Sequence, residues 1–250
     1  MGRLFSSSEE LFKHLLDYGI MEPLIVNEIY DSDDLSQYIS RESYYQLLSR
    51  LVNRGRLGRI SKGIYYIPTS EVFSHVNLTD DILVDMFTAY SKGIEVGEIL
   101  FSEKKIMLSV PQNRKVYTSL IKDHKMTVNG IFFKRVNLAF SVSEKATIEM
   151  LEVLENYYKM GDINHGNLIS MYLSFIRNYD DNVARKVLDT IGYTKSTIDF
   201  LKTILDAHRV PNTLAVYLSR RSKYKHPTID ELKYMADWDR RNLKRRKSEN

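Results

Sequence analysis

The sequence predicts an α+β fold, and three observations favour this class. A serine-capped helix pattern runs directly into a short hairpin pattern near the N-terminus. A strong two-residue hairpin signal, Asn129-Gly130, lies near the middle of the chain, and helical periodicity dominates after Ser141. The expected division is a small helix-and-hairpin domain at residues 1–70 and a second domain at residues 71–250, mixed α/β over 71–140 and mainly helical over 141–250.

The composition of the chain excludes several classes of protein. It contains no cysteine, which excludes disulfide bridges, thiolate chemistry and cysteine-based zinc sites. Its first residues carry charges throughout and lack the apolar core of a signal peptide. No uninterrupted apolar run approaches the roughly 20 residues that span a bilayer. We therefore expect a cytoplasmic protein that does not enter a membrane.

Two helices are expected ahead of the strongest pattern. Ser7 or Ser8 can cap the first of them, and Gly19 ends it. The second helix is expected at residues 24–30, directly after Pro23, because proline is tolerated in the first turn of a helix.

The strongest local pattern in the chain is a third helix that begins after Ser40. Serine is a good N-cap residue, and Gly55 can supply the left-handed conformation that ends a helix. Between these two residues, the apolar side chains have the spacing of one buried stripe. The stripe consists of Tyr44, Leu47, Leu48, Leu51 and Val52.

A short hairpin is expected immediately after this helix. Residues 57–60 and 64–67 are β-prone, and residues 61–63 make the turn between them. A capped helix, a glycine stop and a basic hairpin follow one another in the order of a winged helix-turn-helix. Of the adjacent residues Tyr65 and Tyr66, we expect one to be packed and the other exposed, because side chains alternate along a strand.

The middle of the chain is expected to mix helices and strands. The apolar pattern predicts a helix at residues 80–91 and a strand at residues 105–110. A hairpin is expected at residues 127–135, because Asn-Gly is the strongest two-residue turn signal.

The last part of the chain is expected to be helical. Ser141 and Glu144 have the spacing of a capping box at the start of a long helix. Tyr234 and Trp238 lie one turn apart in the last helix, and we expect them to pack it onto the domain. The later helices are expected at residues 166–178, 181–191, 196–207, 212–222 and 228–245.

Positive charge is concentrated in two places, although the net charge is only +4. Residues 1–39 carry eight acids and two bases, whereas residues 40–70 carry six bases and one acid. Residues 209–250 carry twelve bases and five acids. Basic patches attract phosphate backbones, and many are simply solvated faces. The C-terminal patch therefore has three interpretations: a solvated tail, a second DNA contact, or a surface for an acidic partner.

The residue types of the capped helix and hairpin suit DNA binding. A recognition helix reads base edges mainly from its N-terminal half. Arg41 and Gln46 are of the types that pair bidentately with guanine and adenine, and neither has an obvious partner within the chain. The other outward side chains suit phosphate, base or minor-groove contacts. The expected DNA-binding residues are Arg41, Tyr45, Gln46, Ser49 and Arg50 on the helix, and Arg56, Arg59, Ser61 and Lys62 on the wing.

Residues 40–68 resemble the N-terminal winged helix of the AbiEi antitoxin family, the antitoxin half of a type IV bacterial abortive-infection toxin–antitoxin system. Two features are shared. The first is a helix that ends in the pattern L-x-x-L-x-x-x-G, and the second is a basic wing with a glycine at its tip that ends in an aromatic pair and proline. The matching residues are Leu48, Leu51, Gly55, Arg59, Lys62, Gly63, Tyr65, Tyr66 and Pro68.

The resemblance implies two activities. The winged helix would bind double-stranded DNA, at an inverted repeat in the promoter of its own operon, and repress transcription. The C-terminal domain would counter a nucleotidyltransferase-like toxin, directly or functionally.

No motif for catalysis stands out in the chain. The six histidines include no pair at i, i+4 spacing, and the chain has neither a phosphate-binding loop nor a nucleophile elbow. We therefore expect neither enzyme activity nor a cofactor or metal. Two alternatives to the antitoxin remain open: a one-component regulator whose C-terminal half binds a small ligand, and an adaptor whose winged helix binds protein. An apolar pocket with convergent polar groups in the C-terminal half would favour the ligand-binding regulator.

Overall fold

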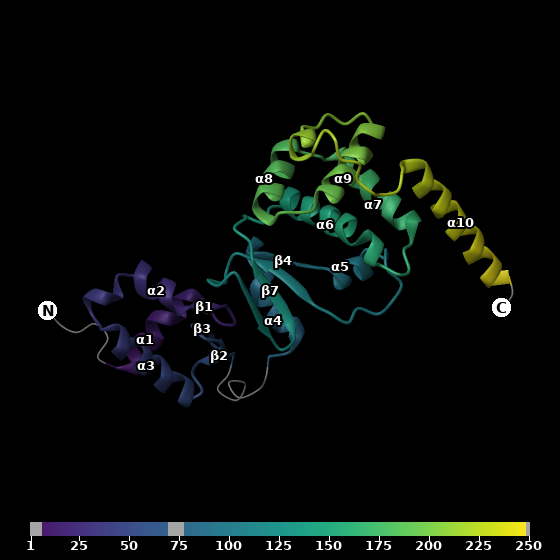
Figure 1. Ribbon diagram of the computed structural model, residues 1–250. Coiled ribbons are helices and arrows are strands. Elements are labelled where there is room, and N and C mark those ends of the chain that lie inside the picture. Colours follow the sequence, from purple (N-terminus) through teal and green to yellow (C-terminus); the bar gives the residue numbers. More distant parts are fainter. Residues whose placement is uncertain (1–6, 70–77, 249–250) are drawn as a thin grey trace.

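The computed structural model describes residues 7–69 and 78–248, with side chains described as far as Asn242. Figure 1 shows an N-terminal unit of helices with a small sheet, a middle sheet with helices against it, and a helical part from which the last helix projects. Helices and strands both contribute, which confirms the predicted α+β class. Among the described helices, none is both long enough and apolar enough to span a membrane.

The N-terminal unit places helices around a three-stranded antiparallel sheet. Its elements are α1 (Ser8–Leu15), η1 (Leu16–Tyr18), β1 (Leu24–Ile25), α2 (Val26–Ser32), η2 (Leu35–Gln37), α3 (Arg41–Asn53), β2 (Gly58–Ser61) and β3 (Ile64–Tyr66). The strand order is β1-β3-β2. The expected helix at residues 24–30 is wrong at its start, because Leu24 and Ile25 pair with Tyr65 and Ile64 as a strand.

The central strand of the small sheet, β3, is buried on both faces. Tyr65 packs into the core of the N-terminal unit, whereas Ile64 and Tyr66 pack on the other side against Leu83 and Phe87 of the next helix. Successive side chains of a strand point to opposite faces, so neighbouring residues of β3 pack into two different hydrophobic cores. The expectation that one of the two tyrosines is exposed is wrong, since Tyr65 is 9% and Tyr66 4% exposed.

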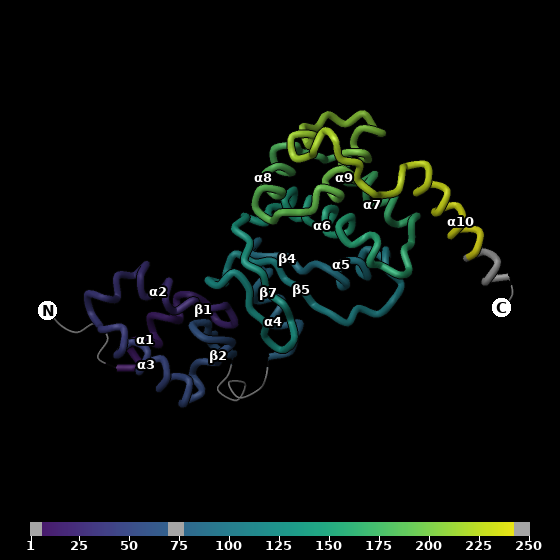
Figure 2. Tube along the Cα trace, viewed as in Figure 1, coloured from purple at the N-terminus to yellow at the C-terminus, as the bar shows by residue number. Residues whose placement is uncertain are grey.

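The middle region builds a four-stranded sheet. Its elements are α4 (Asp80–Thr88), η4 (Ala89–Ser91), β4 (Gly93–Val96), α5 (Glu98–Glu103), β5 (Lys115–Thr118), β6 (Lys125–Val128) and β7 (Ile131–Arg135). The strand order is β4-β5-β7-β6, in which β5 and β7 are parallel and the other pairs antiparallel; Figure 2 traces this part of the chain. The hairpin around Asn129 and Gly130 is confirmed, because both residues take the positive φ that a tight hairpin turn needs.

The strand expected at residues 105–110 does not form. Met107 makes a single antiparallel bridge to Ile163, and the neighbouring residues are irregular. The sheet uses β4 and β5 instead, which the residue pattern did not predict. Both strands are only four residues long. The second partner of β5 is β7, which pairs directly with it in the sheet, although β6 lies between them in the sequence. The local sequence of such short strands carries little signal, because their stability comes from distant partners.

The C-terminal half is a helical bundle. Its elements are α6 (Val142–Asn156), η5 (Tyr157–Lys159), α7 (His165–Arg177), α8 (Asp181–Ile191), α9 (Lys195–Ala207), η6 (Leu214–Tyr217) and α10 (Ile229–Ser248). The capping box of Ser141 and Glu144 is confirmed at the start of α6. Four of the five later helices are confirmed. The helix expected at residues 212–222 is wrong, because only the short turn η6 forms there.

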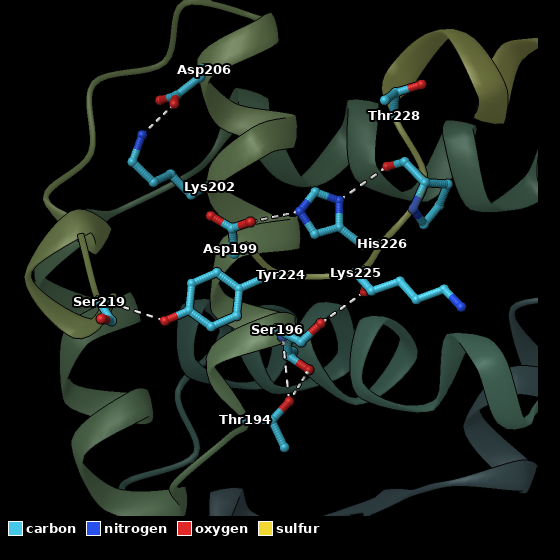
Figure 3. Close-up of polar contacts among 12 residues, drawn as sticks. Thr194, Ser196, Asp199, Lys202, Asp206, Ser219, Tyr224, Lys225, His226 and Thr228 are labelled. Atoms are coloured by element: carbon cyan, nitrogen blue, oxygen red, sulfur yellow. Dashed lines mark hydrogen bonds and ion pairs between the residues drawn. The ribbon is translucent and has the colours of Figure 1, made fainter. Parts of the chain in front are cut away.

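Side-chain contacts hold the irregular segment before α10 against α9. The Ser196 hydroxyl donates a hydrogen bond to the Lys225 carbonyl, with an O···O distance of 2.9 Å. His226 Nε2 lies 2.8 Å from a carboxylate oxygen of Asp199, and its ring stacks parallel to Phe200. Figure 3 shows these polar contacts bridging from α9 to the segment. His226 is thus a structural histidine of this junction.

The last helix packs through a different face from the one expected. Leu232 and Ala236 of α10 are buried, at 0% and 7% exposure. Tyr234 and Trp238, expected to pack the helix onto the domain, are 67% and 57% exposed. The spacing of the two aromatic residues correctly places them on one face, but tertiary packing buries the other face of the helix.

A buried carboxylate joins the middle sheet to the helical half. Glu152 of α6 is 2% exposed and accepts hydrogen bonds from the hydroxyls of Tyr117 and Tyr193, at 2.6 and 3.2 Å. Lys115 Nζ lies 3.3 Å from the same carboxylate. Burial and the negative charge of Glu152 raise the pKa of Tyr117 and of Tyr193 above the usual value for tyrosine, so both hydroxyls stay protonated as donors.

Candidate nucleic-acid interface

Helix α3 separates a buried face from an exposed one. Ser40 caps it by accepting a hydrogen bond from the Ser43 N–H, as expected. Of the five residues in the expected apolar stripe, all but the partly buried Val52 are buried. The opposite face is exposed and includes Tyr45, Gln46, Ser49 and Arg50; Glu42, Ser43 and Asn53 of the same helix are exposed as well. The side chains of Gln46, Ser49 and Arg50 make no hydrogen bond or ion pair within the described residues, so they are available to a partner.

Arg41, at the start of α3, has partners within the chain. Its Nη2 lies 2.7 Å from Oδ1 of Asp31, and its guanidinium stacks over the Tyr30 ring at 4.7 Å from the centroid. The expectation that Arg41 lacks an intrachain partner is therefore wrong. The partners come from the end of α2, which the α2–η2 connection folds back beside the first turn of α3.

The turn between β2 and β3 is basic and anchored at its base. Gly63 has a φ of +80°, in the left-handed region that favours glycine. Its carbonyl accepts a hydrogen bond from the Val26 N–H at the start of α2. Arg59 and Lys62 are exposed and form no ion pair with any described residue. Arg59 Nε donates only to the Ser61 carbonyl, at 3.4 Å, among the described residues, so β2 and the turn present two cations with no paired carboxylate there.

Arg56 lies at the other end of β2, apart from the turn. Its guanidinium stacks over Phe12 of α1 at 4.1 Å from the ring centroid, and Nη2 lies 3.8 Å from Glu9. Arg54 also pairs with Glu9, at 3.7 Å. Arg56 was expected among the DNA-binding residues, but the structure occupies it in packing α1 onto the hairpin.

A hollow of about 590 Å³, which we name the junction groove, brings the other hairpin residues together with α3. On the side of the N-terminal unit it is lined by Asn27, Tyr45, Arg59, Ser61 and Lys62. The Tyr45 hydroxyl donates a hydrogen bond to Oδ1 of Asn27. Four of the nine expected site residues therefore lie around one hollow.

The opposite wall of the junction groove comes from the middle region. It consists of Ile121, Lys122 and Asp123, which follow β5, and Met126 of β6. The Ser61 hydroxyl donates to Met126 Sδ at 3.9 Å, a contact between the two walls. None of these four residues was expected at the site from the sequence. The only sequence signal was the charged run at residues 122–125, which nothing local connects to the hairpin.

Histidine–aspartate pairs are the other titratable contacts of note. His14 lies 2.6 Å from Asp33, and His165 lies 2.9 Å from Asp239. The first contact joins α1 to the residue that caps the end of α2, and the second joins the start of α7 to α10. Within the described residues, no three or more histidine, aspartate or glutamate side chains are grouped as metal ligands would be.

The comparisons with known proteins add no relative. No family model matches the chain. No curated protein is significantly similar to it in sequence.

Proposed function

We propose that residues 1–70 form a winged helix-turn-helix and that the protein is a sequence-specific, DNA-binding transcriptional repressor. The order of elements supports the first part. Helix, strand, two helices and a β-hairpin follow one another, and the strand order is β1-β3-β2. In this assignment α3 is the recognition helix and the β2–β3 turn is the tip of the wing.

One observation carries the proposal. The exposed face of α3 holds Gln46, Ser49 and Arg50, whose side chains make no hydrogen bond or ion pair with a described residue. The cations Arg59 and Lys62 line the junction groove together with Tyr45 and form no ion pair among the described residues. Amide and guanidinium groups read base edges, and cations on an adjacent turn neutralise phosphates. Two carboxylates of this unit are paired elsewhere, Asp31 with Arg41 and Glu9 with Arg54 and Arg56. Glu42 is an exposed carboxylate in the first turn of α3.

The base-reading role of α3 is tested by Gln46→Ala. We expect it to cost about 1–3 kcal/mol of binding free energy on the preferred duplex and much less on random DNA, because an amide that pairs with adenine discriminates between bases. The measurement is a titration of a selected and a scrambled duplex at matched salt. Gln112→Ala, at an exposed residue of the α5–β5 connection, is the control and should change neither affinity. An equal loss on both duplexes would make Gln46 a phosphate contact, and no loss would exclude this helix face from the interface.

We further propose that the protein is the antitoxin of its operon, acting in the cytoplasm by binding rather than by catalysis. The resemblance of residues 40–68 to the AbiEi antitoxins supports this role. The winged helix would repress the operon at an inverted repeat, and residues 71–250 would counter a nucleotidyltransferase-like toxin.

The antitoxin role is tested by co-expression with the nucleotidyltransferase-like protein that we expect the neighbouring gene to encode. The full chain, supplied from an unrelated promoter, should restore growth. The variant Arg59→Glu/Lys62→Glu should restore growth equally while no longer binding DNA, since the toxin is assigned to the other part of the chain. Failure of the full chain to restore growth would refute the antitoxin role but would not bear on the proposed role as a repressor.

One feature of the C-terminal half favours the alternative function, a regulator that binds a small ligand. A hollow of about 780 Å³ runs between α6 and α7, and its lining mixes polar groups such as Ser143 and Asn167 with Met171 and Phe175. Its volume lies in the range of small-molecule sites. Rescue of growth by the full chain would favour the antitoxin, whereas release of DNA by a small metabolite would favour the ligand-binding regulator.

A further inference from the structure

We propose that the junction groove holds one strand of the DNA backbone, so that Lys122, outside the predicted DNA-binding domain, contributes a phosphate contact. The inference rests on the proposed DNA binding. It adds a second wall to the interface, contributed by the middle region.

The charge of the groove fits a polyanion. Its lining includes three exposed cations, Arg59 and Lys62 from one wall and Lys122 from the other. None of the three forms an ion pair with a residue that the structure describes. Among the described residues, Asp123 is the only carboxylate in the lining. The described lining therefore carries three cations and one carboxylate, an excess of positive charge.

The apolar part of the lining fits the rest of a nucleotide backbone. Ile25, Ile64, Tyr65, Ile121 and Met126 line the groove together with the cations. A phosphodiester strand alternates anionic phosphates with largely apolar deoxyribose faces. A lining that mixes exposed cations with apolar side chains matches that alternation better than it matches a fully hydrated free ion.

The segment that presents Lys122 is held in place by hydrogen bonds. Arg135 Nη1 donates to the Lys122 carbonyl at 2.9 Å, and the Arg135 backbone N–H donates to the His124 carbonyl. At the start of the segment, both the N–H and the hydroxyl of Ser119 donate to the Lys92 carbonyl. Ile121 is 2% exposed and anchors the segment in the core shared with Tyr66. The second wall is thus preorganised and does not need to fold upon binding.

Groove and recognition surface are continuous. Tyr45 lines the groove, and Gln46 and Ser49 follow it on the exposed face of α3. A DNA strand that leaves the groove therefore passes onto the face assigned to base readout. This continuity favours a backbone over a separate small ligand.

The proposal is tested with full-length variants and a labelled random duplex. Lys122→Ala should reduce the slope of log K against log[salt] by about 0.9, the value for one lost phosphate contact. Near physiological salt the affinity should fall about fivefold, equally on selected and random duplexes, because phosphates carry no sequence information. Lys195→Ala removes the same charge from an exposed, unpaired position at the start of α9 and should leave the slope unchanged.

Two further measurements make the result decisive. Asp123→Asn should tighten binding, a change that misfolding does not produce. Inorganic phosphate at constant ionic strength should not displace the duplex selectively from the wild-type protein compared with Lys122→Ala. Selective displacement, with an unchanged slope in Lys122→Ala, would assign the groove to a free phosphate and overturn the backbone assignment.

The failure of this inference differs from the failure of the proposed function. If the wild-type protein binds duplex DNA and Lys122→Ala retains its full salt slope, the groove is not part of the interface, although the protein still binds DNA. If the wild-type protein binds no duplex even at low salt, DNA binding itself is refuted, and the groove assignment falls with it.

Discussion

Replacing Glu152 by alanine should lower the free energy of unfolding by about 3–5 kcal/mol, the usual cost of breaking a buried charged contact. The substitution leaves the hydroxyls of Tyr117 and Tyr193 without their acceptor, and an unsatisfied buried donor costs about 1–3 kcal/mol. It also removes the anion that faces Lys115. Urea denaturation followed by circular dichroism measures the change.

The control for this prediction lies one turn earlier on the same helix. Glu149 pairs with Lys104 at 2.6 Å, but its side chain is 24% exposed. Glu149→Ala should therefore cost no more than about 1 kcal/mol, as expected for a solvated ion pair. Glu152→Gln should fall between the two alanine variants, because an amide oxygen can still accept from the tyrosines. Similar small losses for both alanine variants would show that the Glu152 cluster does not hold the sheet to the helices.

Gly93→Ala is expected to have the second large effect, a loss of about 3 kcal/mol at the upper end of overpacking costs. A Cβ atom at this position would lie 2.3 Å from the Phe87 carbonyl oxygen and 2.6 Å from that of Tyr117. Both obstacles are backbone atoms, so no side chain can rotate away. Either the end of α4 or strand β5 must move, and β5 leads into the segment that carries Lys122.

Gly161→Ala is the matched control for Gly93→Ala. No atom lies within 4 Å of the position that its Cβ would take, and its φ is not in the left-handed region. The expected change is within about 1 kcal/mol and can be stabilising, because alanine restricts the unfolded chain. Thermal or urea unfolding of the two variants compares them directly. A cost for Gly93→Ala as small as that for Gly161→Ala would mean that α4 and β5 yield easily at this contact.

The sequence by itself determined the elements whose bonds are local. The N-cap at Ser40 and the capping box at Ser141 act on N–H groups within the same helical turn. The turns at Gly63 and Asn129-Gly130 depend on the φ angles of those residues alone. Helix periodicity depends on neighbours three and four residues away. The α+β class, helix α3 and most of the helical half could therefore be predicted from the residue pattern.

Only the tertiary structure decided features that depend on distant parts of the chain. Strands β1 and β5 are short and exist through partners elsewhere in the sequence, which periodicity cannot reveal. The exposure of Trp238 depends on which face of α10 meets the bundle. The partners of Arg41 depend on how α2 turns toward α3.

The candidate site divides in the same way. The exposed face of α3 and the basic turn could be predicted, because both follow from local periodicity and turn chemistry. The second wall of the junction groove could not, because nothing local relates Lys122 to Lys62, 60 residues earlier in the chain. They meet because one face of the small sheet packs through Ile64 and Tyr66 into the core of the middle region. The burial of apolar surface between distant segments therefore sets the relative position of the two walls. This burial is non-directional, so it leaves no periodic pattern in the sequence from which the contact could be predicted.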